Sequence, residues 1–136
     1  MLKAEGLQKS FGNGRARIDV LRDLTLDIGA GELTLISGPS GCGKSTLLSI
    51  LSGLLDADAG RVIALGEDLV RLNERQIERF RLHHTGFVFQ GFNLFPALTA
   101  LEQVQLPQSY LGFPPAQPTQ PPVLAPEVVG LGLPPA

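Results

Sequence analysis

The sequence is poor in cysteine, in long apolar runs and, toward its end, in positive charge. The single cysteine, Cys42, cannot form an intramolecular disulfide, which fits a reducing compartment. No apolar run approaches the roughly 18 residues that a membrane span needs, and we expect no signal peptide. Without such a run we expect no direct membrane insertion. The formal net charge is −2, without a basic stripe, so we expect no nucleic-acid partner.

The loss of charge divides the chain. Its last Lys or Arg is Arg81, whereas residues 112–136 hold eight of the eleven prolines and only one charged residue, Glu127. Such a composition does not build a packed core. We therefore predict part of a folded domain over residues 1–108, and a proline-rich tail over 109–136 that is disordered or translated out of frame.

The first part has the pattern of an α/β domain. Alternating apolar residues over 2–11 and 18–28 predict an antiparallel pair of strands. Short apolar runs predict further strands at 33–37, 60–66 and 85–90, of which 33–37 and 85–90 are expected to be buried. Helical spacing after residue 44 predicts a helix that Gly53 can end. The pairs Asn73 with Gln76 and Thr99 with Glu102 resemble capping boxes that open two more helices.

The stretch "GPSGCGKST" matches the pattern G-x-x-x-x-G-K-[ST] between a predicted strand and a predicted helix. Its glycines allow close approach of a phosphate, and the N–H groups of about Gly41 to Thr46 form an anion-binding nest. The predicted nucleotide-binding residues of this phosphate-binding loop are Gly38, Pro39, Ser40, Gly41, Cys42, Gly43, Lys44, Ser45 and Thr46.

Within this loop, the residues have distinct expected roles. Lys44 places a positive charge on the β- and γ-phosphates, and the helix that begins near it adds the positive end of its dipole. The Ser45 hydroxyl is suited to Mg²⁺, and Thr46 is expected to hold the α-phosphate. We interpret Cys42 as a small packing residue and not as a catalytic thiol.

The stretches "VLRDLTLDIGAGELTLISGPSGCGKSTLLSILSGLLDADAGRV" and "GFVFQGFNLFPALTALEQVQLP" resemble the nucleotide-binding ATPase of ABC transporters. The second is similar to the group that serves lipoprotein release and macrolide export. The resemblance covers residues 1–108 and implies a partial P-loop NTPase core with an N-terminal antiparallel β subdomain. It also implies ATP and Mg²⁺ as ligands, a transmembrane subunit and a second ATPase subunit as partners, and a cytoplasmic place on the inner face of the membrane.

The resemblance assigns roles outside the loop as well. Phe11 stands where the family has an aromatic residue, usually Tyr, that stacks on adenine, and Val20 borders the same pocket. Gln90 matches the Q-loop glutamine, which reaches Mg²⁺ and the attacking water. After it come four large apolar residues, Phe92, Leu94, Phe95 and Leu98. They either receive a coupling helix of the membrane subunit or pack on the domain's own helical part, and both alternatives stay open.

Other parts of the family's hydrolytic machinery are missing from the sequence. The signature LSGGQ does not occur, and no four apolar residues end in Asp-Glu as a Walker B strand requires. Glu67 and Asp68 follow a glycine in reversed order, so we expect a solvated turn there. His83 and His84 precede Gln90, too early for a switch histidine, and are expected at the surface. The chain alone is therefore predicted to bind ATP at most.

Three origins remain open for such a chain. The first is an ABC ATPase that was truncated or frameshifted, whose open sheet edges would make it marginally stable and prone to aggregate. The second is a short nucleotide-binding module whose proline-rich tail docks on a partner. The third is a different P-loop enzyme, such as a small kinase, against which the Q-loop match argues.

Overall fold

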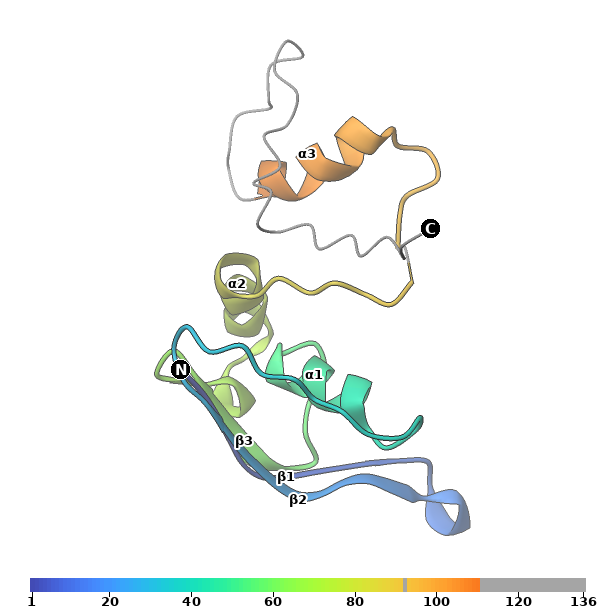
Figure 1. Ribbon diagram of the computed structural model, residues 1–136, viewed down its shortest axis with the longest axis vertical. Coiled ribbons are helices and arrows are strands. Elements are labelled where there is room, and N and C mark those ends of the chain that lie inside the picture. Colours follow the sequence, from blue (N-terminus) through green and yellow to red (C-terminus); the bar gives the residue numbers. More distant parts are fainter. Residues whose placement is uncertain (92, 111–136) are drawn as a thin grey trace, which may run out of the picture. The chain divides into compact units, whose positions relative to one another are not determined.

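The computed structural model describes residues 1–91 and 93–110 (Figure 1). The chain divides into two units, Met1–Phe87 and Val88–Ala136, and each is taken by itself. The first contains a small antiparallel sheet with helices on it. The second, over its described residues, contains a loop and one helix. The predicted tail from residue 111 onward lies outside the described residues.

The sheet of the first unit confirms the predicted strand pair. Strands β1 (Leu2–Phe11) and β2 (Ile18–Ile28) run antiparallel and are connected by a short 3₁₀ turn, η1 (Gly14–Ala16). Strand β3 (Ala59–Ala64), which the sequence also predicted, pairs with the other edge of β1. A two-residue strand, β4 (Glu67–Asp68), completes the order β2-β1-β3-β4.

The short strand β4 corrects one prediction. Glu67 and Asp68 were expected to form a turn, but the turn lies one step earlier, at Leu65 and Gly66. Both have positive φ, 52° and 89°, as a two-residue hairpin turn requires. Asp68 then accepts a hydrogen bond from the Val70 N–H and caps the following 3₁₀ turn, η2 (Leu69–Arg71).

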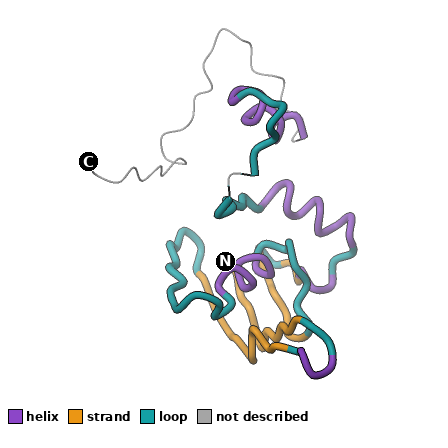
Figure 2. Tube along the Cα trace, turned by 90° about the vertical axis from the view of Figure 1, so that its right-hand side faces the viewer, coloured by secondary structure: helices purple, strands orange, loops and turns teal. Residues whose placement is uncertain are grey.

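Helix α1 (Lys44–Leu51) covers one face of the sheet, and the core forms between them (Figure 2). Helix, strand and turn residues all contribute. The buried apolar residues are Ala4, Leu7, Leu21, Leu47, Ile50, Leu51, Val62, Ala64, Leu69 and Phe80. Because α1 begins directly at the end of the phosphate-binding loop, the burial of its apolar face against the sheet anchors that loop.

The end of α1 follows the predicted glycine. Gly53 has φ 71°, its N–H donates to Ile50 O at 3.0 Å, and the Leu54 N–H donates to Ser49 O at 2.8 Å. This pair of bonds is the Schellman motif, which satisfies carbonyls that the helix end leaves without partners. The prediction that Gly53 ends the helix is therefore confirmed.

Helix α2 (Glu74–His84) begins at the predicted capping box. The Asn73 side chain accepts from the Gln76 N–H at 3.1 Å, and the Gln76 side chain accepts from the Asn73 N–H at 3.0 Å. Two N–H groups of the first turn thereby gain acceptors.

Removal of this cap should cost measurable stability. In Asn73→Ala, the free energy of unfolding should fall by about 1 kcal/mol, the usual effect of losing an N-cap side chain. Urea denaturation followed by circular dichroism measures it. Asn13→Ala is the matched control, because Asn13 precedes η1 without a side-chain cap bond. An equal loss in both variants would contradict the assignment.

The second unit contains α3 (Ala100–Tyr110), and its start confirms the second capping box. The Glu102 carboxylate accepts from Thr99 N at 2.7 Å and from Thr99 Oγ1 at 2.8 Å. These bonds hold the pKa of Glu102 below its usual value. The helix continues through Pro107 to Tyr110, past the predicted domain end at residue 108.

Two predicted strands are absent from the structure. Residues 33–37 and 85–90 form no strand, so both predictions of a buried strand are wrong here. Leu33 is 98% exposed and Val88 is 95% exposed. A strand is formed by pairing with neighbouring strands, and the sheet of the described residues, in the order β2-β1-β3-β4, includes neither segment. Both segments have the apolar composition of buried strands, but a strand is buried only when other segments of the chain pair with it and cover it.

Candidate functional site

The phosphate-binding loop is shaped by glycines at positions where other residues are strained. Gly41 has φ 79°, and Gly43, the N-cap of α1, has φ 95°. A Cβ at Gly43 would lie 2.8 Å from Val20 Cγ1 and 3.2 Å from Leu21 Cδ2. Only glycine both adopts this left-handed conformation readily and fits against strand β2. The close approach fixes where the loop meets the sheet.

The first turn of α1 presents free donors. The Leu47 N–H donates to Gly43 O at 2.8 Å, as the first bond of the helix. The four preceding N–H groups, from Gly43 to Thr46, have no acceptor among the described residues. Such donors, together with the positive end of the helix dipole, form an anion site. The backbone therefore fits the phosphate groups that the sequence predicted here.

Lys44 lies back over its own loop. Its Nζ donates to Gly38 O at 2.9 Å and to Pro39 O at 2.7 Å, and lies 3.7 Å from Cys42 Sγ. The ammonium thus joins the two ends of the loop through the carbonyls of Gly38 and Pro39. Cys42 is exposed, and its Sγ lies against Gly38 within the loop.

The two hydroxyl residues after Lys44 are available for ligands. Ser45 is exposed and Thr46 is half-buried. The described residues include no group of three or more His, Cys, Asp or Glu side chains that could hold a metal. In nucleotide sites Mg²⁺ is commonly held by one or two side chains together with phosphate oxygens, and the exposed Ser45 hydroxyl fits that role.

The end of the β1–β2 hairpin borders the loop. The register shifts between Lys9 opposite Leu21 and Ser10 opposite Asp19, which leaves Val20 in a bulge. A bulge changes the direction in which neighbouring side chains point, and here both Val20 and Leu21 lie against Gly43. Phe11, the last residue of β1, is 45% exposed. The structure thus places Val20 beside the phosphate-binding loop and leaves the Phe11 ring open to a ligand.

The remaining predicted residues lie elsewhere. Gln90 is exposed and belongs to the second unit, where its Q-loop role stays a prediction. Leu94 and Phe95 are exposed, and a hydrogen bond of 2.6 Å from Gln103 Nε2 to Phe95 O ties their loop to α3. Phe92 lies outside the described residues. His83 and His84 are exposed on α2, which confirms that they are surface residues.

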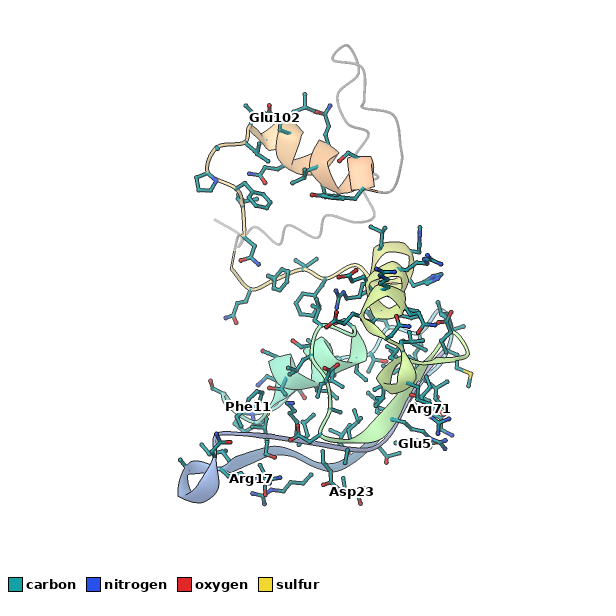
Figure 3. The ribbon with its side chains drawn as sticks, turned by 180° about the vertical axis from the view of Figure 1, so that it is seen from behind. Glu5, Phe11, Arg17, Asp23, Arg71 and Glu102 are labelled. Carbon is teal, nitrogen blue, oxygen red and sulfur yellow. The ribbon has the colours of Figure 1, made fainter. Side chains whose placement is uncertain are left out.

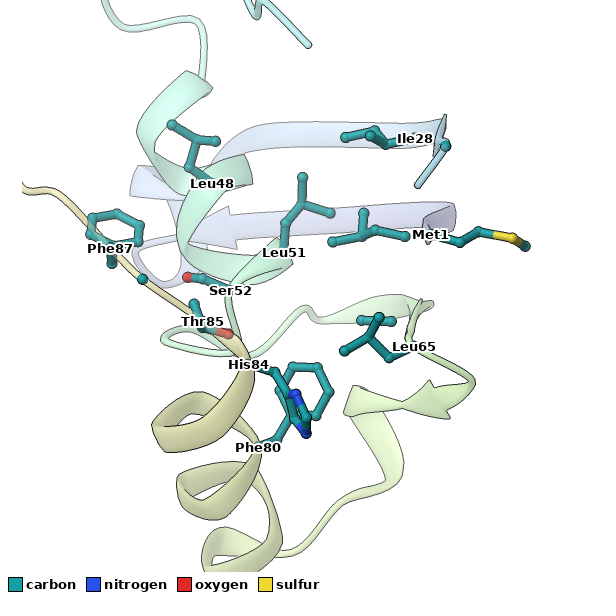
Figure 4. Close-up of a pocket in the computed structure, with 14 residues that line it drawn as sticks. Met1, Ile28, Leu48, Leu51, Ser52, Leu65, Phe80, His84, Thr85 and Phe87 are labelled. Atoms are coloured by element: carbon teal, nitrogen blue, oxygen red, sulfur yellow. The ribbon is translucent and has the colours of Figure 1, made fainter. Parts of the chain in front are cut away.

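A separate hollow of about 400 Å³ lies between α1, α2 and one end of the sheet (Figure 4). Leu48 and Leu51 line it from α1, and Phe80 and His84 line it from α2. The centres of the His84 and Phe80 rings are 5.1 Å apart. No residue of the phosphate-binding loop lines it, and its walls are mainly apolar. It is therefore not a continuation of the phosphate site.

Sequence reasoning missed two residues next to Phe11. The Lys9 ammonium lies 5.6 Å from the centre of the Phe11 ring and is paired with Asp58 at 2.8 Å. The two-residue spacing of Lys9 and Phe11 on a strand could have shown that they share a face. Asp58 carries no local signal, because it is 48 positions from its partner Ser10.

Similarity to known proteins identifies the family of this chain. The family model described as "ABC transporter" matches residues 21–127, a span that runs past the predicted boundary at residue 108. The chain is 47% identical over 107 residues to the lipoprotein-releasing system ATP-binding protein LolD 2 of Rhodospirillum rubrum, covering 79% of this chain and 46% of that protein. It is 44% identical over 117 residues to the macrolide export ATP-binding/permease protein MacB of Brucella abortus, covering 86% and 18%.

A solved structure shares the fold. The dimeric post-hydrolysis state of the ATP-binding cassette MJ0796, bound to ADP and Pi, has a TM-score of 0.77 and 39% identity over 81% of this chain and 47% of that one. The chain thus spans about half the length of that cassette and of LolD 2, and less of MacB. The fold is a partial ABC ATPase fold with an antiparallel β subdomain. Among the described residues, no helix is long and apolar enough to cross a membrane. The chain belongs to the ABC transporter family and corresponds to part of its ATP-binding domain.

Proposed function

We propose that this chain binds Mg-ATP through the loop from Gly38 to Thr46. The observation that carries the proposal is the backbone cradle at the start of α1. The four N–H groups from Gly43 to Thr46 have no acceptor among the described residues, and the Lys44 ammonium lies in the same loop. Glycine at position 43 lets this loop lie close against β2. That arrangement fits a chain of phosphates better than it fits any neutral ligand.

Each residue has a part in this proposal. The N–H groups of the first turn of α1 hold phosphate oxygens, and Lys44 turns from the carbonyls of Gly38 and Pro39 to the β- and γ-phosphates. Ser45 contributes a hydroxyl ligand to Mg²⁺, and Thr46 holds the α-phosphate. Phe11 and Val20 border the adenine, and Gln90 reaches Mg²⁺ and water. Bound ATP supplies a γ-phosphoryl group for transfer to that water.

The chain covers about half of LolD 2 and of the structural relative, and 18% of MacB. A whole protein of this kind would use the site for work at a membrane. Relatives are named for lipoprotein release and for macrolide export, and a structural relative is a dimer. We infer a second ATPase subunit and a transmembrane subunit as partners, the latter contacted by the exposed apolar loop after Gln90. Such a protein would be cytoplasmic and peripheral on the inner face of the membrane.

The chain by itself is expected to bind ATP without turning it over. Neither LSGGQ nor an Asp-Glu pair after an apolar strand occurs in its sequence, so the carboxylate that would polarise the attacking water is missing from it. Isothermal titration with Mg-ATP should show saturable binding, and a phosphate-release assay on the same sample should match a protein-free control. Turnover that disappears in Lys44→Ala would overturn this part of the proposal.

A further inference from the structure

Strand β1 extends beyond its partner β3, and a side chain continues the pairing. The last backbone pair is Gln8 opposite Ala59, and the Asp58 N–H donates to Gln8 O at 2.9 Å. Past that point, the Asp58 carboxylate accepts from Ser10 N at 2.8 Å and from Ser10 Oγ at 2.9 Å. Because β3 begins only at Ala59, the Asp58 carboxylate replaces a β3 carbonyl as the hydrogen-bond acceptor for the end of β1.

The same carboxylate fixes Lys9. The distance from Lys9 Nζ to Asp58 Oδ1 is 2.8 Å, and the Lys9 side chain is only 13% exposed. A lysine is rarely covered to this extent unless its charge is paired. The hydrogen bonds from Lys9 and from Ser10 lower the pKa of Asp58 to about 2, so the carboxylate is charged at neutral pH.

The fixed ammonium lies against Phe11. Lys9 and Phe11 are two residues apart on β1 and share a face, and Lys9 Nζ lies over the ring at 5.6 Å from its centre. An exposed aromatic side chain at a strand end loses rotational freedom when a ligand stacks on it, which weakens binding. A neighbour that already restricts the ring removes part of that loss.

We propose that Asp58 and Lys9 are positioning residues that hold Phe11 ready to stack on the adenine ring of bound ATP. The inference rests on the proposed function, since it needs ATP at the phosphate-binding loop. Neither residue touches phosphate in this assignment. Their loss should therefore affect ligands that contain a base and spare a ligand that is phosphate alone.

The test compares two ligands on the full chain by isothermal titration: Mg-ATP and Mg-tripolyphosphate. Asp58→Ala should weaken ATP binding about fivefold, the lower end of the effect of base–aromatic stacking. Binding of tripolyphosphate should change less than about twofold, which also shows that the loop is still folded. Lys9→Met, which keeps an apolar chain without the charge, should show the same selective loss if Asp58→Ala does not fold.

Glu5→Ala is the matched control. Glu5 also connects β1 to β3 through a charged pair, with 2.6 Å from Arg61 Nε to its carboxylate, and it also pairs with Lys3. Figure 3 shows Glu5 toward the end of the sheet away from Phe11. Its loss should leave the ratio of the two affinities unchanged, because nothing in this pair reaches the Phe11 ring.

A double-mutant cycle identifies Phe11 as the intermediary. In a Phe11→Leu background, Asp58→Ala should cause no further loss of ATP affinity. A further fivefold loss there, an equal loss for both ligands, or no change in either would overturn the positioning role alone. A wild-type chain that binds neither ligand would instead overturn the proposed function, and this inference with it.

Discussion

Replacement of Lys44 by alanine is expected to weaken Mg-ATP binding about 10- to 100-fold. A hydrogen bond between charged partners contributes roughly 1.5–3 kcal/mol, which converts to that range. The ammonium already has two carbonyl acceptors within the loop, Gly38 O and Pro39 O. ATP binding is therefore an exchange of partners, and the loss should lie below what a fully free lysine would give.

Lys3→Ala is the control for this measurement. Lys3 is a charged residue of β1 that pairs with Glu5 at 3.1 Å and belongs to no part of the loop. Its removal lowers the net positive charge by the same amount without touching the cradle. Isothermal titration should give a wild-type affinity for Lys3→Ala. Equal affinities in the two variants would show that the loop is not where ATP binds.

Replacement of Leu7 by alanine is expected to cost about 2–5 kcal/mol of unfolding free energy. Leu7 of β1 is fully buried and belongs to the core cluster that strand and α1 residues form, and its loss leaves a cavity in that core. Among the described residues the core has ten buried apolar side chains, with partly buried ones packed against it, so this loss should be a large fraction of the stability of the unit. Urea denaturation followed by circular dichroism measures it.

Leu33→Ala is the matched leucine for the same experiment, and its expected effect is within about 0.5 kcal/mol. Leu33 is 98% exposed in the structure, although its apolar surroundings in the sequence predicted a buried strand. A loss of several kcal/mol at Leu33 would show that residues 33–37 are packed in this chain after all. Higher solubility of the Leu33→Ala variant than of the wild type would agree with the exposure of the apolar segment 33–37 to solvent.

Local signals in the sequence predicted local structure well. Each capping box uses a side chain and a backbone N–H only three residues apart, as at Asn73 with Gln76 and at Thr99 with Glu102. Gly53 ends its helix through bonds within the same turn. These features need no distant partner, so the sequence around them is sufficient to specify them.

Predictions failed where an element needed a distant partner. The run from Leu33 to Ser37 has the composition of a central strand, yet it forms none in this structure. Strand formation requires backbone hydrogen bonds to neighbours that lie far away in sequence.

The sequence by itself determined the phosphate-binding loop and the family, because both rest on residues at fixed short spacings from Gly38 to Thr46 and around Gln90. The tertiary structure alone decided what surrounds the loop. It set Val20 against Gly43 through a bulge. It also brought Asp58 to Ser10 and Lys9, which are 48 and 49 positions away in the sequence, and so held Lys9 beside Phe11. Such contacts join strands that pair only after the chain has folded, and charge pairs of this kind follow from the register of the sheet.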